Sequence, residues 1–168
     1  MHEKSIALLN KAIADELSAI HQYMYFHFHC DDQGYDLLAS LFKKTAIEEM
    51  LHVEHAAERI LFLQGEVEMV VAEKTEKIHD VRKMLERAAA MEEQSAKEYN
   101  EWANTCSANA DSATKRLFED LVADEERHYD QYMTEMETMD KFGEQYLALQ
   151  SIERSKTVSM RAGPTAAD

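Results

Sequence analysis

Four long stretches of the sequence repeat apolar residues at alternating steps of three and four, the spacing of one face of an α-helix. They span Ser5 to Cys30, Tyr35 to Gln64, Asp80 to Cys106 and Ser112 to Thr138. At ~1.5 Å of rise per residue, each would form a rod roughly 40 Å long, which is typical of helical bundles. The chain has only four Gly and one Pro, too few turn formers for a protein of many short strands. The pattern therefore predicts an all-α fold with four main helices.

The connections between these stretches indicate how the helices are arranged. Two breaks are short, Asp31 to Gly34 and Ser107 to Asp111, whereas the third runs from Gly65 to His79. A short connection makes its two helices antiparallel neighbours, while a long one can travel back along the bundle. We therefore expect two antiparallel hairpins joined by a long crossover. A shorter amphipathic segment predicts a C-terminal fifth helix from Lys141 to about Arg154.

The length of the chain fits one domain. A sequence of 168 residues can bury one compact core and is too short for two ordinary domains. We expect a single domain over residues 1–158 and a flexible C-terminal tail over residues 159–168. The two cysteines provide neither a disulfide framework nor a CxxC metal motif.

Charge and hydropathy argue against several classes of partner. The formal net charge is -15, and no run of Lys and Arg could neutralise a nucleic acid backbone or an anionic lipid surface. The N-terminal segment MHEKSIALLNKAIADELS carries acidic residues within its first apolar run, so we expect neither a signal peptide nor a transit peptide. No window approaches the ~20 apolar residues of a membrane span. A cytoplasmic protein without nucleic acid or membrane partners is expected.

Each main helix carries a glutamate in the middle of its apolar stripe, and two of them add a histidine three residues later. The six residues are Glu16, Glu49, His52, Glu92, Glu125 and His128. Residues three apart lie on the same helix face, so both side chains of a Glu-x-x-His pair can reach one ion. Four converging buried carboxylates would repel one another unless a positive charge lies between them. The set predicts a site for two divalent metal ions, most simply iron.

The two halves of the chain repeat this pattern at a constant offset of 76 residues. Five residues recur in this way: Glu16, Tyr23, Cys30, Glu49 and His52 correspond to Glu92, Tyr99, Cys106, Glu125 and His128. The repeat indicates two hairpins related by a pseudo-twofold axis, each supplying half of one site. Glu48 and Glu126 fall beside the stripe and are interpreted as solvated or as supporting residues. Cys30 and Cys106 are interpreted as small apolar residues near helix ends, too far apart to form a disulfide.

The sequence resembles the bacterioferritins over nearly its whole length, most clearly in LNKAIADELSAIHQY, IEEMLHVEHAAERILFLQGEVEM, LVADEERHYDQYM and KFGEQYLALQ. The resemblance implies a ferritin-like four-helix bundle with a short fifth helix, assembled as a homo-oligomeric 24-mer. It also implies iron storage and detoxification by a ferroxidase, which binds two irons per subunit and oxidises Fe(II) with dioxygen or peroxide.

The same resemblance assigns roles to individual residues. It implies that Glu49 and Glu125 bridge the two irons, and that Tyr23 is a hydrogen-bond donor or electron source beside them. Met50 matches the methionine that, in this family, is an axial ligand of haem b at a twofold subunit interface. On a helix Met50 lies about 100° from Glu49, so we expect it to face away from the metal site.

Two other functions use a related bundle. One is a di-iron or di-manganese redox enzyme of peroxidase type, which would need the same carboxylates and histidines. The other is a Dps-like dodecameric protector of DNA, which the acidic balance of the chain and its lack of a basic tail disfavour. The size of the assembly distinguishes the storage protein from the redox enzyme, and salt-sensitive DNA binding would favour the Dps-like protein.

Overall fold

The computed structural model describes residues 2–161, except the side chains at 153, 154 and 157–161, and within this range the chain forms five α-helices. Within these residues no strand is present. The helices are α1 (Glu3–Asp32), α2 (Asp36–Phe62), α3 (Val81–Ala108), α4 (Ser112–Phe142) and α5 (Glu144–Arg161). The all-α prediction is confirmed, and each of the four main helices lies within a few residues of its predicted range.

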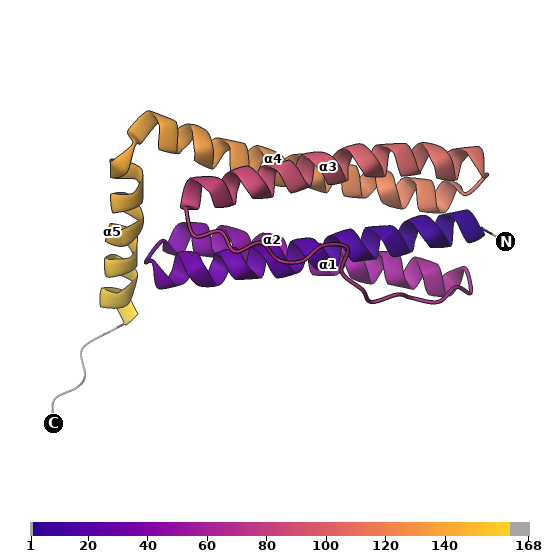
Figure 1. Cartoon of the computed structure of the whole chain (residues 1–168), viewed down its shortest axis with the longest axis horizontal. Helices are drawn as coiled ribbons and strands as arrows, with labels where there is room; N and C mark the ends of the chain where they lie inside the picture. The colour runs from indigo at the N-terminus through magenta and orange to yellow at the C-terminus, as the bar shows by residue number, and fades with distance from the viewer. Residues whose placement is uncertain (1, 162–168) are drawn as a thin grey trace, which may run out of the picture.

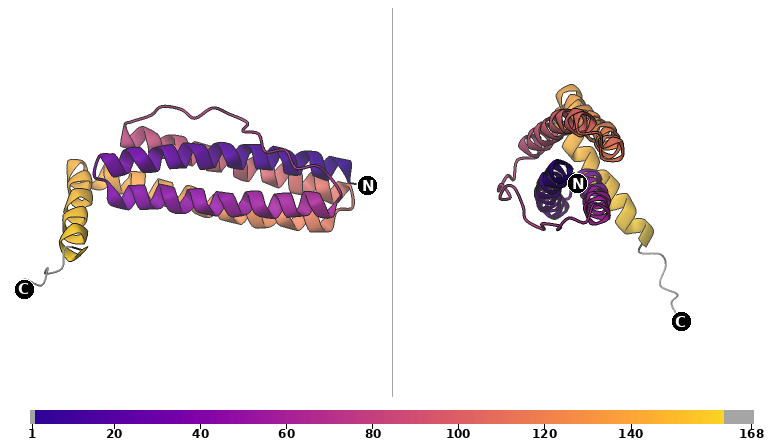
Figure 2. Two further views of the ribbon diagram at one scale, coloured as in Figure 1. Left: turned by 90° about the horizontal axis from the view of Figure 1, so that it is seen from below. Right: turned by 90° about the vertical axis from the view of Figure 1, so that its right-hand side faces the viewer.

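Figure 1 shows α1 with α2 and α3 with α4 as two hairpins stacked into a four-helix bundle. The long segment between α2 and α3 returns along the outside of α1, as the two views in Figure 2 show. Side chains from one stripe of α1 hold this crossover by hydrogen bonds to its backbone. Asn10 bonds to Glu66 and Glu68, and Ser18 accepts from the backbone N–H groups of Ala72 and Glu73.

Local signals explain where the helices begin and turn. Asp80 and Asp111 cap α3 and α4, because their side chains accept hydrogen bonds from the backbone N–H three residues later. Gly34, between α1 and α2, has φ of 84°, a conformation that glycine adopts without steric strain. At Gly65 a Cβ would lie 2.8 Å from the Ile6 side chain, so the absence of a side chain allows the crossover to leave α2 close to α1.

The core divides into two apolar clusters with a polar layer between them. One cluster lies toward α5 and contains Tyr23, Phe26, Phe42, Met84 and Tyr132 among others. The second lies toward the N-terminus and contains Leu9, Ile13, Ile60, Tyr99 and Phe118 among others. On every main helix the predicted metal ligands fall between the residues of these two clusters. The polar layer is therefore enclosed between one apolar cluster at each end of the bundle.

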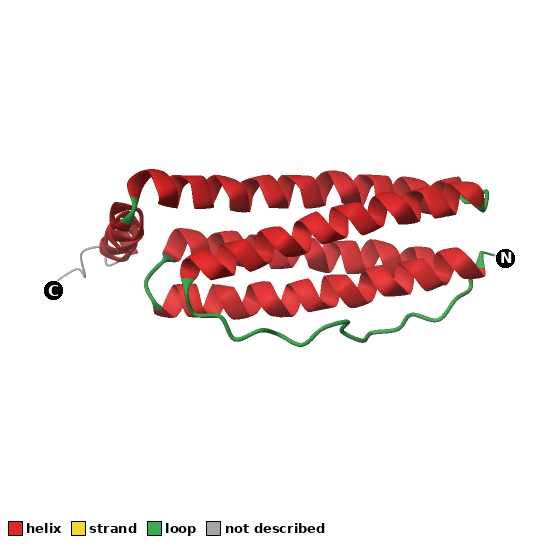
Figure 3. Cartoon of the chain, turned by 45° about the horizontal axis from the view of Figure 1, so that its top comes forward, coloured by secondary structure: helices red, strands yellow, loops and turns green. Residues whose placement is uncertain are grey.

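The fifth helix differs from its predicted bounds. Lys141 and Phe142 belong to α4, and α5 begins after Gly143, which lies at the turn between the two helices with φ of 55°. Figure 3 shows α5 lying across the end of the bundle. It extends to Arg161 rather than to Arg154, and residues 162–168 of the predicted tail lie outside the described residues. None of the helices in the described part has the length and apolar content needed to cross a membrane.

Candidate metal centre

The six residues predicted as metal ligands meet at one level of the bundle. Each is buried, with no more than 4% of its surface exposed. They form two overlapping groups whose potential ligand atoms lie within 4.8 Å of one another. The groups are Glu16, Glu49, His52 and Glu125, and Glu49, Glu92, Glu125 and His128. The structure thus brings together the whole predicted set, with two residues common to both groups.

Distances from the inner nitrogen of His52 define the first half of the site. Its Nδ1 lies 2.7 Å from Glu49 Oε2, 3.3 Å from Glu125 Oε1 and 3.4 Å from Glu16 Oε1. Glu16 is near this imidazole alone, whereas Glu49 and Glu125 also approach the second histidine. The first half therefore combines one exclusive carboxylate with two shared ones.

The second half repeats this arrangement around His128. Its Nδ1 lies 3.1 Å from Glu49 Oε1, 3.6 Å from Glu92 Oε2 and 3.9 Å from Glu125 Oε2. Glu49 thus presents one oxygen to each histidine, and so does Glu125. Such a carboxylate can contact two ions at once, which is the geometry expected of a bridging ligand.

Several of these inward atoms make no hydrogen bond among the described residues, although they lie close to one another across the cluster. They are both carboxylate oxygens of Glu49, Oε1 of Glu125, and Nδ1 of His52 and of His128. Buried polar atoms without partners are rare in folded proteins, because each one loses its hydration without compensation. A pair of divalent cations between them would satisfy all five. The oxygen and imidazole donors suit iron, manganese or zinc.

Two of the buried carboxyl groups hold their protons more tightly than an ordinary glutamate does. Burial, together with the charges of Glu92 and Glu16, raises the pKa of Glu49 from 4.5 to about 7. Burial and the neighbouring carboxylates also raise the pKa of Glu125 well above its ordinary value. The cluster therefore holds protons near neutral pH, and a metal ion that binds here would displace them.

The histidines respond to the same carboxylates. Burial lowers the pKa of each imidazole, but the carboxylates around its Nδ1 raise it by more, so the pKa values of His52 and His128 lie far above 6.5. Protonated imidazoles balance part of the negative charge in the metal-free protein. Both must lose a proton before their inner nitrogens can bind a metal ion.

Two tyrosines donate hydrogen bonds to Glu16 and Glu92, the carboxylates that each approach only one histidine. Tyr23 donates a hydrogen bond to Glu92 Oε1, and Tyr99 donates one of 2.7 Å to Glu16 Oε1. Both rings are fully buried, and burial raises the pKa of both phenols well above 10. The hydroxyls therefore remain protonated donors at neutral pH. Their positions follow the 76-residue repeat, so Tyr99 serves the first half-site as Tyr23 serves the second.

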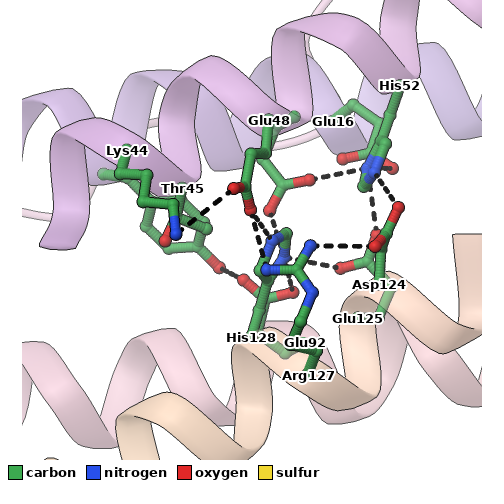
Figure 4. A network of polar contacts seen from close by, with 12 residues as sticks. Glu16, Lys44, Thr45, Glu48, His52, Glu92, Asp124, Glu125, Arg127 and His128 are labelled. Atoms are coloured by element: carbon green, nitrogen blue, oxygen red, sulfur yellow. Dashed lines mark hydrogen bonds and ion pairs between the residues drawn. The ribbon is translucent and has the colours of Figure 1, made fainter.

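Outer carboxylates complete the surroundings of the histidines (Figure 4). The Nε2 atom of His128 lies 2.6 Å from Glu48 Oε2, and Nε2 of His52 lies 3.2 Å from Asp124 Oδ2. Glu48 is thus a supporting residue, one of the two roles predicted for it, while Glu126 is exposed. Sequence reasoning missed Asp124. The repeat could have found it, since Asp124 follows Glu48 by 76 residues.

The remaining candidates lie away from the six ligands. Met50 is 54% exposed on α2, between Ile47 and Leu51, which are 47% and 43% exposed. It therefore faces outward, as its helical position predicts. Cys30 and Cys106 are both buried with free thiols. Cys30 lies 3.7 Å from Met84 Sδ and Cys106 the same distance from Ser5 Oγ, so each occupies a packed helix end.

Comparisons with known proteins agree with this geometry. Residues 6–142 match the family model of the ferritin-like domain. The bacterioferritin of Desulfovibrio desulfuricans is 38% identical over 86% of this chain and 81% of its own length. That of Rhodobacter capsulatus is 35% identical over 87% of this chain and 91% of its own length.

Solved structures show the same similarity. An X-ray structure of the Desulfovibrio desulfuricans bacterioferritin, described as showing its diiron site in different catalytic states, has a TM-score of 0.86 at 37% identity. It covers 88% of this chain and 86% of that one. The bacterioferritin BfrA of Mycobacterium tuberculosis has a TM-score of 0.85 at 30% identity, covering 89% of this chain and 95% of that one.

Proposed function

This chain belongs to the bacterioferritin family, and on that basis we propose that it is an iron-storage ferroxidase whose catalytic site is the buried cluster of four glutamates and two histidines. The observation that carries the proposal is the set of inward atoms on Glu49, Glu125 and the two histidines, which make no hydrogen bonds in the described part of the chain and approach one another. A structural cluster would satisfy these atoms with hydrogen bonds, whereas a site built for cations leaves them available.

The geometry supports a distinct role for each ligand. Glu49 and Glu125 face both histidines and would bridge two Fe(II) ions, which are the substrate. The exclusive carboxylates would complete each half, Glu16 with His52 and Glu92 with His128. Tyr23 would hold Glu92 by its hydrogen bond.

Binding two ions side by side matches the electron count of the reaction. Two Fe(II) ions give up one electron each, and one dioxygen takes both with two protons to form hydrogen peroxide. Peroxide in the same role takes two electrons and two protons to form two water molecules. The product is Fe(III), which would be stored as mineral in the cavity of the assembly.

Anaerobic titration with Fe(II) tests this function. We expect two tightly bound Fe(II) per chain, followed by rapid formation of Fe(III) when dioxygen or peroxide is added in a stopped-flow instrument. The double variant Glu49→Ala, Glu125→Ala should lose rapid oxidation while its circular dichroism stays helical. Glu126→Ala is the matched control, since Glu126 is an exposed neighbour of Glu125. Unchanged oxidation in the double variant would remove the cluster from the mechanism.

We also propose a 24-mer, because the family is oligomeric and storage needs an enclosed cavity. The exposed apolar residues Ile47, Met50 and Leu51 support burial of this face of α2 against a second chain. Sedimentation of the native protein tests the size. A particle no larger than a dimer would contradict the storage shell and favour a peroxidase-like di-metal enzyme.

Haem b is a further proposal for the same face. The Met50 thioether is accessible and has apolar neighbours, which suits an axial ligand to haem shared by two chains. Protein purified with haem available should show low-spin Soret and α bands. These bands should be lost in Met50→Leu but kept in Met69→Leu, which changes another exposed methionine, on the crossover. Identical bands in Met50→Leu would exclude this ligand.

A further inference from the structure

The outer carboxylates that contact the histidines are themselves joined by one side chain. Arg127 on α4 donates from Nη1 to Glu48 Oε2 at 3.0 Å and from Nη2 to Asp124 Oδ1 at 2.8 Å. Glu48 contacts His128, and Asp124 contacts His52. Figure 4 shows Arg127 between the two acids. Glu48, Arg127 and Asp124 thus form a continuous arch of contacts from one histidine ligand to the other.

Each acid of the arch acts across the two hairpins. Glu48 lies on α2 and contacts a histidine of α4, whereas Asp124 lies on α4 and contacts a histidine of α2. The acids are only partly exposed, with 25% of the Glu48 side chain and 44% of the Asp124 side chain accessible. Arg127 thus connects a contact from an acid of α2 to a histidine of α4 with a contact from an acid of α4 to a histidine of α2.

The arch departs from the symmetry of the site. Glu48 and Asp124 are related by the 76-residue repeat, as are the two histidines. The repeat partner of Arg127 is Leu51, which cannot donate a hydrogen bond. A single arginine therefore serves both half-sites, so its loss affects both, while the loss of either acid affects one.

Arginine suits this position because of its shape. The planar guanidinium presents several N–H groups in a fixed fork and can bond two carboxylates at once, while the lysine ammonium is a compact point charge. A carboxylate that accepts from the outer N–H of a metal-binding histidine fixes the orientation of the ring and directs the inner nitrogen at the metal ion. Fixing both carboxylates would fix both imidazoles.

We propose that Arg127 is a positioning residue of the metal centre, holding Glu48 and Asp124 against the outer nitrogens of both histidine ligands. The proposal rests on the proposed function, because it assigns Arg127 to the same site. Loss of such a supporting contact typically lowers metal affinity by about 10- to 100-fold. Arg127 acts through the acids, so we expect about a 10-fold loss, and at both metal ions together.

Anaerobic titration of the metal-free full-length protein with Co(II) tests the proposal. Co(II) reports its ligands by visible absorption, and competition with a chelator gives the affinity of each of the two binding steps. Arg127→Gln should weaken both steps about 10-fold and alter the absorption bands. Glu48→Gln should weaken mainly the step at His128, and Asp124→Asn mainly the step at His52. These two variants also test the arch without removing the arginine.

The matched control is Arg116→Gln, which removes the same charge from α4. Arg116 lines a cavity of about 570 Å³ that also reaches His52 and Asp124, but it makes none of the contacts of the arch. It should bind Co(II) as the native protein does. Arg127→Lys should resemble Arg127→Gln, since a point charge cannot fork between two acids.

Three results would overturn the proposal. They are native Co(II) affinities and spectra in Arg127→Gln, an equal loss in Arg116→Gln, and full recovery in Arg127→Lys, which would show that only charge matters. Failure of the proposed function is a separate outcome, in which the native protein itself does not bind two Co(II) per chain. Melting of the metal-free variants provides the folding check, and similar melting temperatures for Arg127→Gln and Arg116→Gln are expected.

Discussion

Replacing Glu49 with Gln should stabilise the metal-free protein at high pH while it impairs metal binding. The pKa of Glu49 rises from 4.5 to about 7 on folding, mainly because of burial. A carboxyl group whose pKa is higher in the folded state than in the unfolded state contributes stability to the fold. This stability is complete below pH 4.5 and is lost as the pH rises through 7. At 1.36 kcal/mol per unit, the loss at Glu49 is about 3 kcal/mol at pH 8.

Gln has nearly the same shape and no charge to bury, so Glu49→Gln should escape this loss. For a chain of this size, about 3 kcal/mol corresponds to roughly 6–12 °C in Tm. The assay is thermal unfolding followed by circular dichroism between pH 5 and pH 8, with a chelator present throughout. We expect the native and variant proteins to melt close together at pH 5 and the variant to melt higher at pH 8.

Glu126→Gln is the control for the change in charge. Glu126 is exposed beside the cluster, so its variant should follow the native melting curve within about 2 °C at every pH. An equal difference in Tm between Glu49→Gln and the native protein at pH 5 and at pH 8 would contradict this prediction, because it would show that Glu49 ionises in the folded protein at no cost in free energy. With Co(II) in place of the chelator, the order of the melting temperatures should be reversed, because the metal ion stabilises the native protein more than it stabilises Glu49→Gln.

Three further predictions concern single contacts. Tyr99→Phe removes the hydrogen bond to Glu16 and should weaken one Co(II) binding step about 5-fold, as measured by chelator competition. Asp111→Ala removes both the cap of α4 and the buried partner of Arg59, and should lower the free energy of unfolding by about 3 kcal/mol in urea while two Co(II) still bind. Gly65→Ala forces a methyl group against α1 and should destabilise by about 1–3 kcal/mol, read from the same urea midpoint.

The six central residues could be predicted because each lies on the stripe that its helix must bury. A carboxylate on such a stripe needs a cation, and the Glu-x-x-His spacing places both groups on one helix face. Periodicity alone therefore leads to Glu49 and His52 at a shared ion. It cannot show which oxygen faces which histidine, because that depends on how the two hairpins are set against each other.

The link that Arg127 makes between Glu48 and Asp124 could not be predicted from the sequence, for the same reason. Glu48, Asp124 and Arg127 lie at the edges of their stripes, where acidic and basic residues are common on any soluble helix. Only the packing of α2 against α4 shows that they meet. The crossover is similar, since its length predicted a return along the bundle but its path depends on Asn10 and Ser18, which look like ordinary polar positions.

Two iron ions at the centre of the bundle can be located directly by anomalous diffraction. Crystals soaked anaerobically with Fe(II) should show two anomalous peaks at the iron edge in each chain. One should lie between Glu16 and His52 and the other between Glu92 and His128, with Glu49 and Glu125 adjacent to both. A single peak in the cluster, or iron bound only elsewhere on the chain, would contradict the two-ion site.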